Sequence, residues 1–468
     1  MRRFPYRTVL VLLAFATPSL RGDGTFTVNT VLDAPDVASD GVCATPAGTC
    51  SLRAAIQEAN AVSGASLILL PAGTYPLVVP GTGGAEVGDL DVTKPMEIRG
   101  AGAGTTIIDA ASLGDRIFHV LTAGAFVISG VTMKKGSVPG DGGCIRHLDG
   151  YLQLSRTVVS DCSASRGGGI YSVSSLGFSA TDTTFELNNT DGPGGALLLG
   201  GPGTYEVARC LFRENVASGL TGEGGAIALG GAPFVNVVNT TFESNHTSNT
   251  GGAVGWEPSS TAFVKLYNVT VAGNNAASGG AFYKTGGFLY IRNSVFSGNI
   301  DSGGGSDCIG TFNSYVYNRF AVPAAGCNPL VVEGTVESGS VSLGPLQDNG
   351  GETMTRAVPT GSPLLDVSPA AACVAPDNNP LTKDQRGVKR PLFGGCDAGA
   401  FEREPVGDAN GDGAVTVTDV FYLINYLFAG GTKPPGRANV NGNGTIDVGD
   451  VFYLINYLFA GGAAPIGS

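Results

Sequence analysis

A repeat of about 27 residues fills the middle of the chain and limits its fold more than any other feature. Gly-Gly pairs recur at positions 142, 168, 194, 224, 251 and 279. A second marker lies between them, an apolar residue followed three positions later by asparagine: Phe185/Asn188, Phe212/Asn215, Phe242/Asn245, Val271/Asn274 and Phe296/Asn299. Repeats of about this length indicate a solenoid, in which each unit buries its apolar face against the next.

Short alternating segments between these markers predict strands, as at 226–229 and 288–291. Strands this short, in a repeat near 27 residues, fit a right-handed parallel β-helix. We expect it over residues 25–330, as a rod of about nine turns and roughly 40 Å at one strand spacing per turn. The phenylalanines should stack inside the rod and the asparagines should form ladders at its bends.

Three Asn-x-Thr triplets, at Asn239, Asn245 and Asn268, match glycosylation sequons. Because they fall at the expected bends, we interpret them as ladder residues.

Charge and hydropathy along the sequence indicate where the protein is located. Residues 1–16 combine a basic start with an apolar run, which predicts a signal peptide with an uncertain cleavage site. No later apolar run is long enough to span a membrane. The net charge of −12 excludes a typical nucleic-acid-binding protein. We therefore expect an extracellular protein, either secreted or associated with the cell surface.

Nine cysteines fit an oxidising location. The expected disulfide pairs are Cys43 with Cys50, Cys308 with Cys327, and Cys373 with Cys396. Cys144 and Cys162 lie less than one repeat apart and are a further candidate pair, which leaves Cys210 over.

The last sixty residues contain one unit twice, a twelve-residue loop followed by an identical segment at 420–431 and 451–462. Oxygen-bearing residues recur in each loop with a glycine at position 6, the spacing a calcium ion requires. The predicted ligands are Asp408, Asn410, Asp412, Ala414, Thr416 and Asp419 in loop one, and Asn439, Asn441, Asn443, Thr445, Asp447 and Asp450 in loop two. We expect two structural Ca²⁺ ions, with the weaker affinity in loop two because it carries fewer carboxylates. The alternative is a pair of Asn/Gly-rich turns.

The segments after the loops predict amphipathic helices that end at Gly430-Gly431 and its copy. One apolar face combines Val420, Leu423, Ile424, Leu427 and Phe428. Aromatic residues extend the apolar surface beyond that face. Helix pairing accounts for part of this surface, and the rest indicates a partner site. The candidate partner residues are Val417, Thr418, Phe421, Tyr422, Val448, Gly449, Phe452 and Tyr453.

This region, residues 407–462, resembles a type I dockerin. The resemblance implies calcium binding and attachment to a cohesin domain of an extracellular scaffold. Family members often carry Ser/Thr pairs at loop positions 10 and 11 and basic residues in the helices. Here those positions are Val417-Thr418 and Val448-Gly449, and neither helix contains lysine or arginine. We therefore expect a cohesin-like or other extracellular scaffold partner that differs from the familiar ones.

Two further segments resemble families of secreted bacterial β-helix proteins. Residues 50–60 are similar to the CSLREA motif, and the apolar face of Leu52, Ala55, Ile56 and Ala59 suits a helix that caps the rod. Residues 331–402, with Asp384-Gln-Arg-Gly and Cys396-Asp-Ala-Gly-Ala-Phe-Glu402, are similar to the choice-of-anchor Q domain. That family follows a β-helix and precedes an attachment element.

Catalytic chemistry is weakly indicated. Many β-helices have the pectin lyase-like fold and cleave polysaccharides, and such enzymes need carboxylates clustered across turns, with an arginine or lysine in lyases. Asp141, Arg166 and Asp191 occupy comparable places around the Gly-Gly pairs and are the weak candidates. Solvated turn residues are the simpler interpretation. His119 is interpreted as a packed strand residue.

The sequence is therefore consistent with two functions. The first is a non-catalytic rod that binds polysaccharide or another surface and is attached through the dockerin-like region. The second is a dockerin-borne lyase or glycoside hydrolase in polysaccharide catabolism. The missing catalytic motif favours the first.

Overall fold

The computed structural model describes residues 24–303, 307–321, 326–335 and 341–466. The expected signal peptide at residues 1–16 lies outside the described residues. The remainder forms three parts: a rod (described residues 24–335), an adaptor (341–405) and a helical module (406–466).

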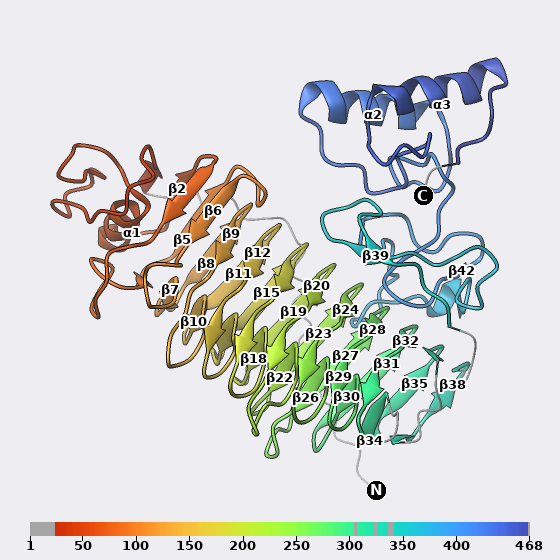
Figure 1. Cartoon of the computed structure of the whole chain (residues 1–468), viewed down its shortest axis with the longest axis horizontal. Coiled ribbons are helices and arrows are strands. Elements are labelled where there is room, and N and C mark those ends of the chain that lie inside the picture. Colours follow the sequence, from red (N-terminus) through yellow and green to blue (C-terminus); the bar gives the residue numbers. More distant parts are fainter. Residues whose placement is uncertain (1–23, 304–306, 322–325, 336–340, 467–468) are drawn as a thin grey trace, which may run out of the picture.

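The rod is a parallel β-solenoid of about nine turns, which confirms the predicted fold class (Figure 1). Four parallel sheets run along it. Sheet A contains β1 (Gly24–Thr27), β2 (Ser66–Leu70), β5 (Met96–Gly100), β8 (Ala125–Ser129), β11 (Tyr151–Ser155), β15 (Gly177–Thr181), β19 (Thr204–Ala208), β23 (Phe234–Val238), β27 (Phe263–Tyr267), β31 (Phe288–Arg292), β35 (Ser314–Val316) and β38 (Val332–Glu333). Sheet B contains β3 (Gly73–Pro76), β6 (Thr106–Asp109), β9 (Thr132–Lys134), β12 (Val158–Ser160), β16 (Thr184–Glu186), β20 (Leu211–Arg213), β24 (Thr241–Glu243), β28 (Thr270–Ala272), β32 (Val295–Ser297) and β36 (Arg319–Phe320).

Two further parallel sheets, C and D, complete the rod. Sheet C contains β4 (Leu90–Val92), β7 (Phe118–Val120), β10 (Ile145–His147), β14 (Ile170–Ser172), β18 (Leu197–Leu199), β22 (Ile227–Leu229), β26 (Val254–Trp256), β30 (Phe282–Tyr283), β34 (Cys308–Phe312) and β37 (Cys327–Pro329). The shorter sheet D contains β13 (Ser163–Ala164), β17 (Asn189–Thr190), β21 (Val216–Ala217), β25 (His246–Thr247), β29 (Asn275–Ala276) and β33 (Ile300–Asp301).

Both expected internal stacks are present. The rings of Phe185, Phe212 and Phe242 stack with centroids 4.7 and 5.0 Å apart. An asparagine ladder runs beside them, in which each side-chain amide donates to the next asparagine Oδ1 at 2.8–2.9 Å, through Asn188, Asn215, Asn245, Asn274 and Asn299. The ladder satisfies buried polar groups at every bend, so the repeat specifies the register.

The three sequon asparagines, Asn239, Asn245 and Asn268, are buried. They are turn residues of the solenoid, as expected.

The Gly-Gly pairs mark sites where neighbouring turns touch. Gly224 has a φ of 67°, a left-handed conformation that glycine adopts without strain. A Cβ on Gly225 would overlap the carbonyl oxygen of Gly252 on the next turn. Glycine is therefore required here by both backbone conformation and contact distance.

Helix α1 (Leu52–Ala61) lies over the N-terminal end of the rod (Figure 1). Ser51 caps it by accepting from the Ala54 amide. Its apolar side chains are buried, and the buried Arg53 guanidinium is 2.7 Å from Asp33. The predicted capping helix is thus confirmed.

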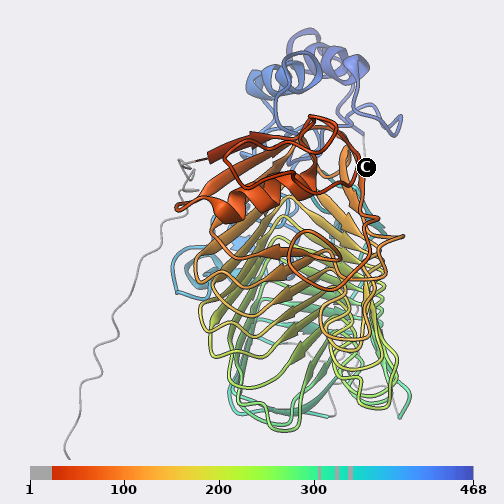
Figure 2. The ribbon, with the colours of Figure 1, turned by 90° about the vertical axis from the view of Figure 1, so that its left-hand side faces the viewer.

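The adaptor folds back along the side of the rod (Figure 2). It contains β39 (Leu346–Gln347), β40 (Thr355–Arg356), β41 (Ser368–Pro369), a 3-10 helix at Ala370–Ala372 and β42 (Gly395–Cys396). Its side chains contact the rod at and next to strand β24. Arg356 Nε is 2.7 Å from Glu243, Arg390 donates to Asn239 at 3.0 Å, and Gln385 bonds Thr241 at 2.7 Å.

Disulfides join Cys43–Cys50, Cys144–Cys162, Cys308–Cys327 and Cys373–Cys396. The expected pairs are confirmed, and Cys210 is a buried free thiol.

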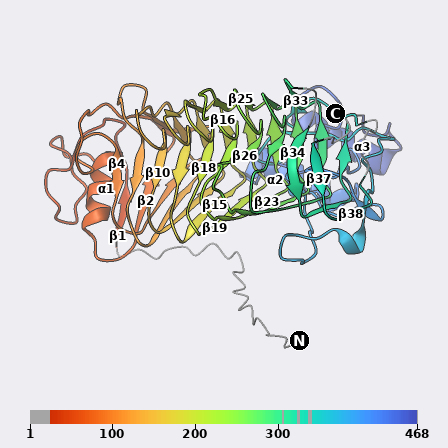
Figure 3. The ribbon, with the colours of Figure 1, turned by 90° about the horizontal axis from the view of Figure 1, so that it is seen from below.

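The helical module holds α2 (Val417–Ala429) and α3 (Val448–Ala460), which pack against each other. Gly430 and Gly461 end the helices in the left-handed conformation, as the sequence predicts. Seen from below, the module lies behind the C-terminal half of the rod (Figure 3), and Figure 1 shows the adaptor between the two. Within the described ranges, no helix has the length and apolarity needed to cross a membrane.

Candidate functional site

In the first predicted calcium loop, two of the predicted ligands, Asp408 and Asp419, are buried, whereas Asp412 is exposed. Asp408 accepts from the amides of Asp412 and Gly413, at 3.0 and 2.7 Å. Asp419 accepts from the amides of Asn410 and Thr416, at 3.0 and 2.8 Å. The Asp419 carboxylate also completes the capping box of α2, so the start of the helix fixes the last ligand position.

Two carboxylates of this loop are shielded from solvent. Asp408 and Asp419 are buried, and none of the ion pairs in the described parts of the chain involves them. Burial, together with the neighbouring Asp419 and Asp412 charges, raises the pKa of Asp408 to about 6. Burial likewise raises the pKa of Asp419. A divalent cation would remove this penalty, so the donor set fits calcium.

The second loop repeats the geometry with fewer charges. Asp450 is buried and accepts from the amides of Val440, Asn441 and Asp447, at 2.8, 3.2 and 2.9 Å. Asn439, the first predicted ligand, has a buried Oδ1 without a hydrogen-bond partner in the described structure. A buried side-chain oxygen that accepts no hydrogen bond is available to coordinate a metal ion, so this loop also fits calcium.

Only part of the predicted apolar face of each helix is buried. Val420 and Leu423 of α2, with Val451 and Leu454 of α3, form a small core between the helices. Leu427 packs against it. Ile424 and Phe428 of the same face are exposed, 37% and 68%. The helical period alone does not show which part of the face the partner helix covers.

Each helix therefore presents an apolar stripe to solvent. The α2 stripe is Val417, Phe421, Ile424 and Phe428, and the α3 stripe is Val448, Phe452, Ile455 and Phe459. Phe421 is 64% and Phe452 65% exposed, so both candidate partner residues are accessible. Thr418 is exposed, while Tyr422, Gly449 and Tyr453 are half-buried. Two matched stripes begin directly at the two calcium loops.

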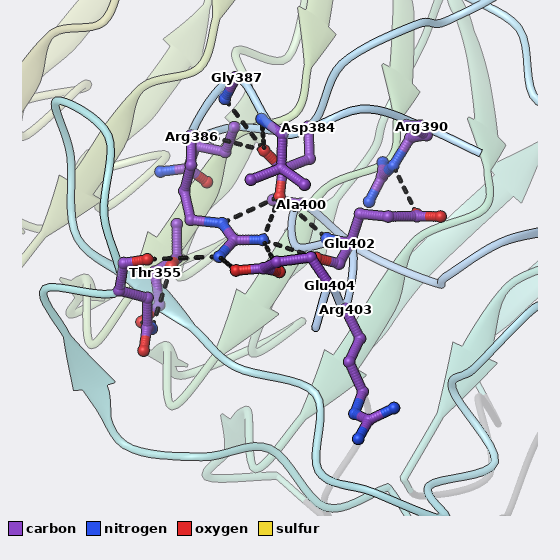
Figure 4. Close-up of polar contacts among 12 residues, drawn as sticks. Thr355, Asp384, Arg386, Gly387, Arg390, Ala400, Glu402, Arg403 and Glu404 are labelled. Atoms are coloured by element: carbon purple, nitrogen blue, oxygen red, sulfur yellow. Dashed lines mark hydrogen bonds and ion pairs between the residues drawn. The ribbon is translucent and has the colours of Figure 1, made fainter. Parts of the chain in front are cut away.

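A buried polar network lies within the adaptor, close to the start of the module (Figure 4). The Arg386 guanidinium contacts Asp384 at 2.7 Å and Glu404 at 2.6 Å, and stacks 3.6 Å from the Phe401 ring centre. The arginine and both carboxylates are fully buried. The two sequence motifs around Asp384 and Phe401 therefore meet in one network.

The adaptor also contacts loop one directly. The Lys389 amide donates to the Gly411 carbonyl at 2.7 Å, and Leu392 packs on Gly413. Lys433, between the helices, pairs with Asp348 at 2.7 Å. Sequence reasoning missed these contacts, because nothing in the periodic pattern indicates which loop touches the adaptor.

The weak catalytic candidates lie on the rod and only two of them meet. Arg166 contacts both carboxylate oxygens of Asp141, at 2.8 and 3.1 Å, on adjacent turns. The next turn of this ladder is occupied by Pro193, whose carbonyl accepts from the Gly167 amide. Asp191 lies two residues earlier and is exposed. The expected alignment of all three side chains is therefore not present.

Comparison with known families supports the assignment of the C-terminal region. Residues 406–461 match the model of the dockerin type I domain. Domains of this type bind cohesins and generally bind calcium, and the proteins that carry them are typically extracellular or associated with the cell surface. Among curated proteins, none matches the chain.

Proposed function

We propose that this chain is a secreted bacterial rod that a scaffold protein holds through the helical module, and that the rod binds a polysaccharide or another extracellular surface. The module binds two structural calcium ions and docks onto a cohesin-like domain. The observation that carries this proposal is the pair of exposed apolar stripes that start at the two calcium loops.

The chemistry of the stripes sets the kind of partner. Large apolar side chains exposed in rows favour an interface, because solvent exposure of such patches is costly. Aromatic residues in particular supply much of the binding energy of protein interfaces. Since neither helix carries a lysine or arginine, the partner face should be apolar and should not depend on acidic residues.

A pull-down against a panel of cohesin domains, with calcium or with chelator, tests the attachment. We expect calcium-dependent capture, weakened in the double variant Phe421→Ala/Phe452→Ala. Phe393→Ala is the matched control, since that adaptor ring is as exposed as Phe428 but lies outside the module. Capture that survives chelator, or that the control weakens equally, contradicts the proposal.

The pairing of Asp141 with Arg166 favours binding over catalysis on the rod. A carboxylate held at both oxygens by one guanidinium is poorly placed to act as an acid or base. Purified protein should retain pectins, alginates or neutral glycans on a column without releasing unsaturated or reducing ends, with or without calcium. Release of such ends, abolished by Asp141→Ala or Arg166→Ala, would favour the polysaccharide-degrading alternative instead.

A further inference from the structure

Asp91 and His119 lie side by side on the outer face of sheet C. The strand register pairs Asp91 of β4 with His119 of β7, and His119 with Arg146 of β10. The residues on either side of Asp91 and His119 are buried in the core, so the alternation of the strands turns these two side chains outward. His119 is thus a strand residue, as expected, and its side chain packs against Asp91 at the surface of the sheet instead of in the core.

Three potential metal ligands converge at this place. Asp89, Asp91 and His119 each offer one ligand atom, and these atoms lie within 4.8 Å of one another. His119 Nδ1 is 3.2 Å from Asp91 Oδ1. Atoms bound to one ion at about 2.0–2.2 Å lie about 3–4 Å apart. The His119–Asp91 pair is therefore already at this spacing, and a wider pair closes by a small side-chain rotation.

Carboxylates outnumber guanidinium groups around the three residues. Asp89, Asp91 and Asp115 are largely buried carboxylates. Arg116 contacts one oxygen of Asp89 at 2.7 Å and lies 3.9 Å from Asp115, and Arg146 lies 3.5 Å from His119. A divalent cation would balance the remaining carboxylate charge.

We propose that Asp89, Asp91 and His119 bind a divalent transition-metal ion. One imidazole nitrogen with two carboxylate oxygens suits zinc, manganese or cobalt. Calcium prefers oxygen ligands alone, as the two loops of the helical module provide. The site is therefore separate from the calcium loops in both position and chemistry.

The hydrogen bonds of His119 indicate which atoms would change partners when an ion binds. Arg146 Nη1 lies 3.5 Å from Nε2. Because a guanidinium only donates, Nε2 accepts, and Nδ1 carries the proton that faces Asp91. A metal ion at Nδ1 replaces that proton, which moves to Nε2. Arg146 then turns toward Asp141, whose carboxylate is 3.9 Å from its buried Nε, an atom without a hydrogen-bond partner in the described residues.

Cobalt(II) is the probe that tests the site, because its visible absorption reports the ligands. The full chain is first saturated with calcium to fill the helical module, and then titrated with Co²⁺. We expect one Co²⁺ per chain, with a visible absorption band that zinc abolishes by displacement. His119→Gln and Asp91→Asn should each weaken binding more than about a hundredfold, beyond the usual loss from an outer-shell change.

His246→Gln is the matched control, since His246 is exposed on sheet D. It should bind Co²⁺ as the wild type does. The fluorescence of the buried Trp256 shows whether each variant keeps the rod folded, and Asp91→Asn decides the matter if His119→Gln does not. A wild-type chain without the band, a His119→Gln chain that binds like wild type, or a loss that His246→Gln shares would each overturn the proposal.

Discussion

The rod and the helical module are both built from sequence repeats, but they use repetition differently. Each turn of the rod has a neighbour on both sides that pairs its backbone and continues its stacks of phenylalanine and asparagine. The module has two copies, and the core between them contains seven buried side chains, three of them alanine or a loop valine. Its centre also holds buried carboxylates. A long repeat array is stabilised by its own chain, whereas we expect a pair of repeats with so small a core to depend on the proposed calcium ions.

Removal of calcium is the strongest way to separate the two regions. Chelation should unfold α2 and α3 while the rod remains folded, because each occupied site contributes about 4 kcal/mol at a thousandfold excess of ion over Kd. Hydrogen exchange should show loss of protection in 417–429 and 448–460. The fluorescence of Trp256, which is buried in the rod, should not change. Intact helices in chelator would contradict the comparison.

Interruption of the asparagine ladder should destabilise the rod alone. Asn245→Ala removes the bonds to Asn274 and to the Phe212 carbonyl, and leaves the Asn215 amide groups without their acceptor. Two or more buried unpaired groups should cost about 3–5 kcal/mol. Urea unfolding followed by Trp256 measures this. Asn249→Ala, at the surface of the same rod, should cost less than about 1 kcal/mol.

Acidification should weaken the rod through His147. Burial lowers the pKa of His147 to about 4, while the unfolded chain has the ordinary value of 6.5. Its imidazole accepts from Ser172 at 2.8 Å and donates to the Gly150 carbonyl at 3.2 Å, which requires the neutral form. Between these two pKa values the unfolded chain binds the extra proton, so stability falls as pH falls, by about 3 kcal/mol in all.

Urea unfolding at pH 7 and at pH 4 checks this, with His147→Gln as the variant that should lack the difference due to this residue. His246→Gln should keep it. If His147→Gln shows the same fall as wild type, burial of His147 is not its cause.

The smallest expected effect is a change in the calcium affinity of loop one that loop two does not share. Leu392→Ala should weaken calcium binding in loop one about fivefold, a loss near 1 kcal/mol, because Leu392 packs on Gly413. Loop two should be unaffected. Calorimetric titration resolves the two events, and Leu381→Ala, elsewhere in the adaptor, is the control. Equal weakening of both loops would show that the module responds as one unit.

The periodic parts of the molecule were predictable and the contacts between parts were not. Phe242 and Asn245 identify their own neighbours, because the same residues recur one turn away. Arg390 and Asn239 meet across 151 residues without any repeat to relate them. Asp191 does not align with Arg166. It is Pro193 whose carbonyl pairs with the preceding turn, and counting residues from the Gly-Gly pairs cannot show this. The period likewise leaves open which side of α2 faces α3, so it could not show that Ile424 and Phe428 stay exposed.

The adaptor determines how mechanical load passes through the molecule. A pull on the helical module reaches Glu404, which Arg386 holds in a buried bidentate pair. Arg356 and Arg390 then transmit the force to Glu243 and Asn239 on the middle turns. The load therefore enters the solenoid from its flank and is shared in shear by several turns. If the rod binds a surface as proposed, this path of force should protect it from being unzipped, one turn at a time, from its C-terminal end.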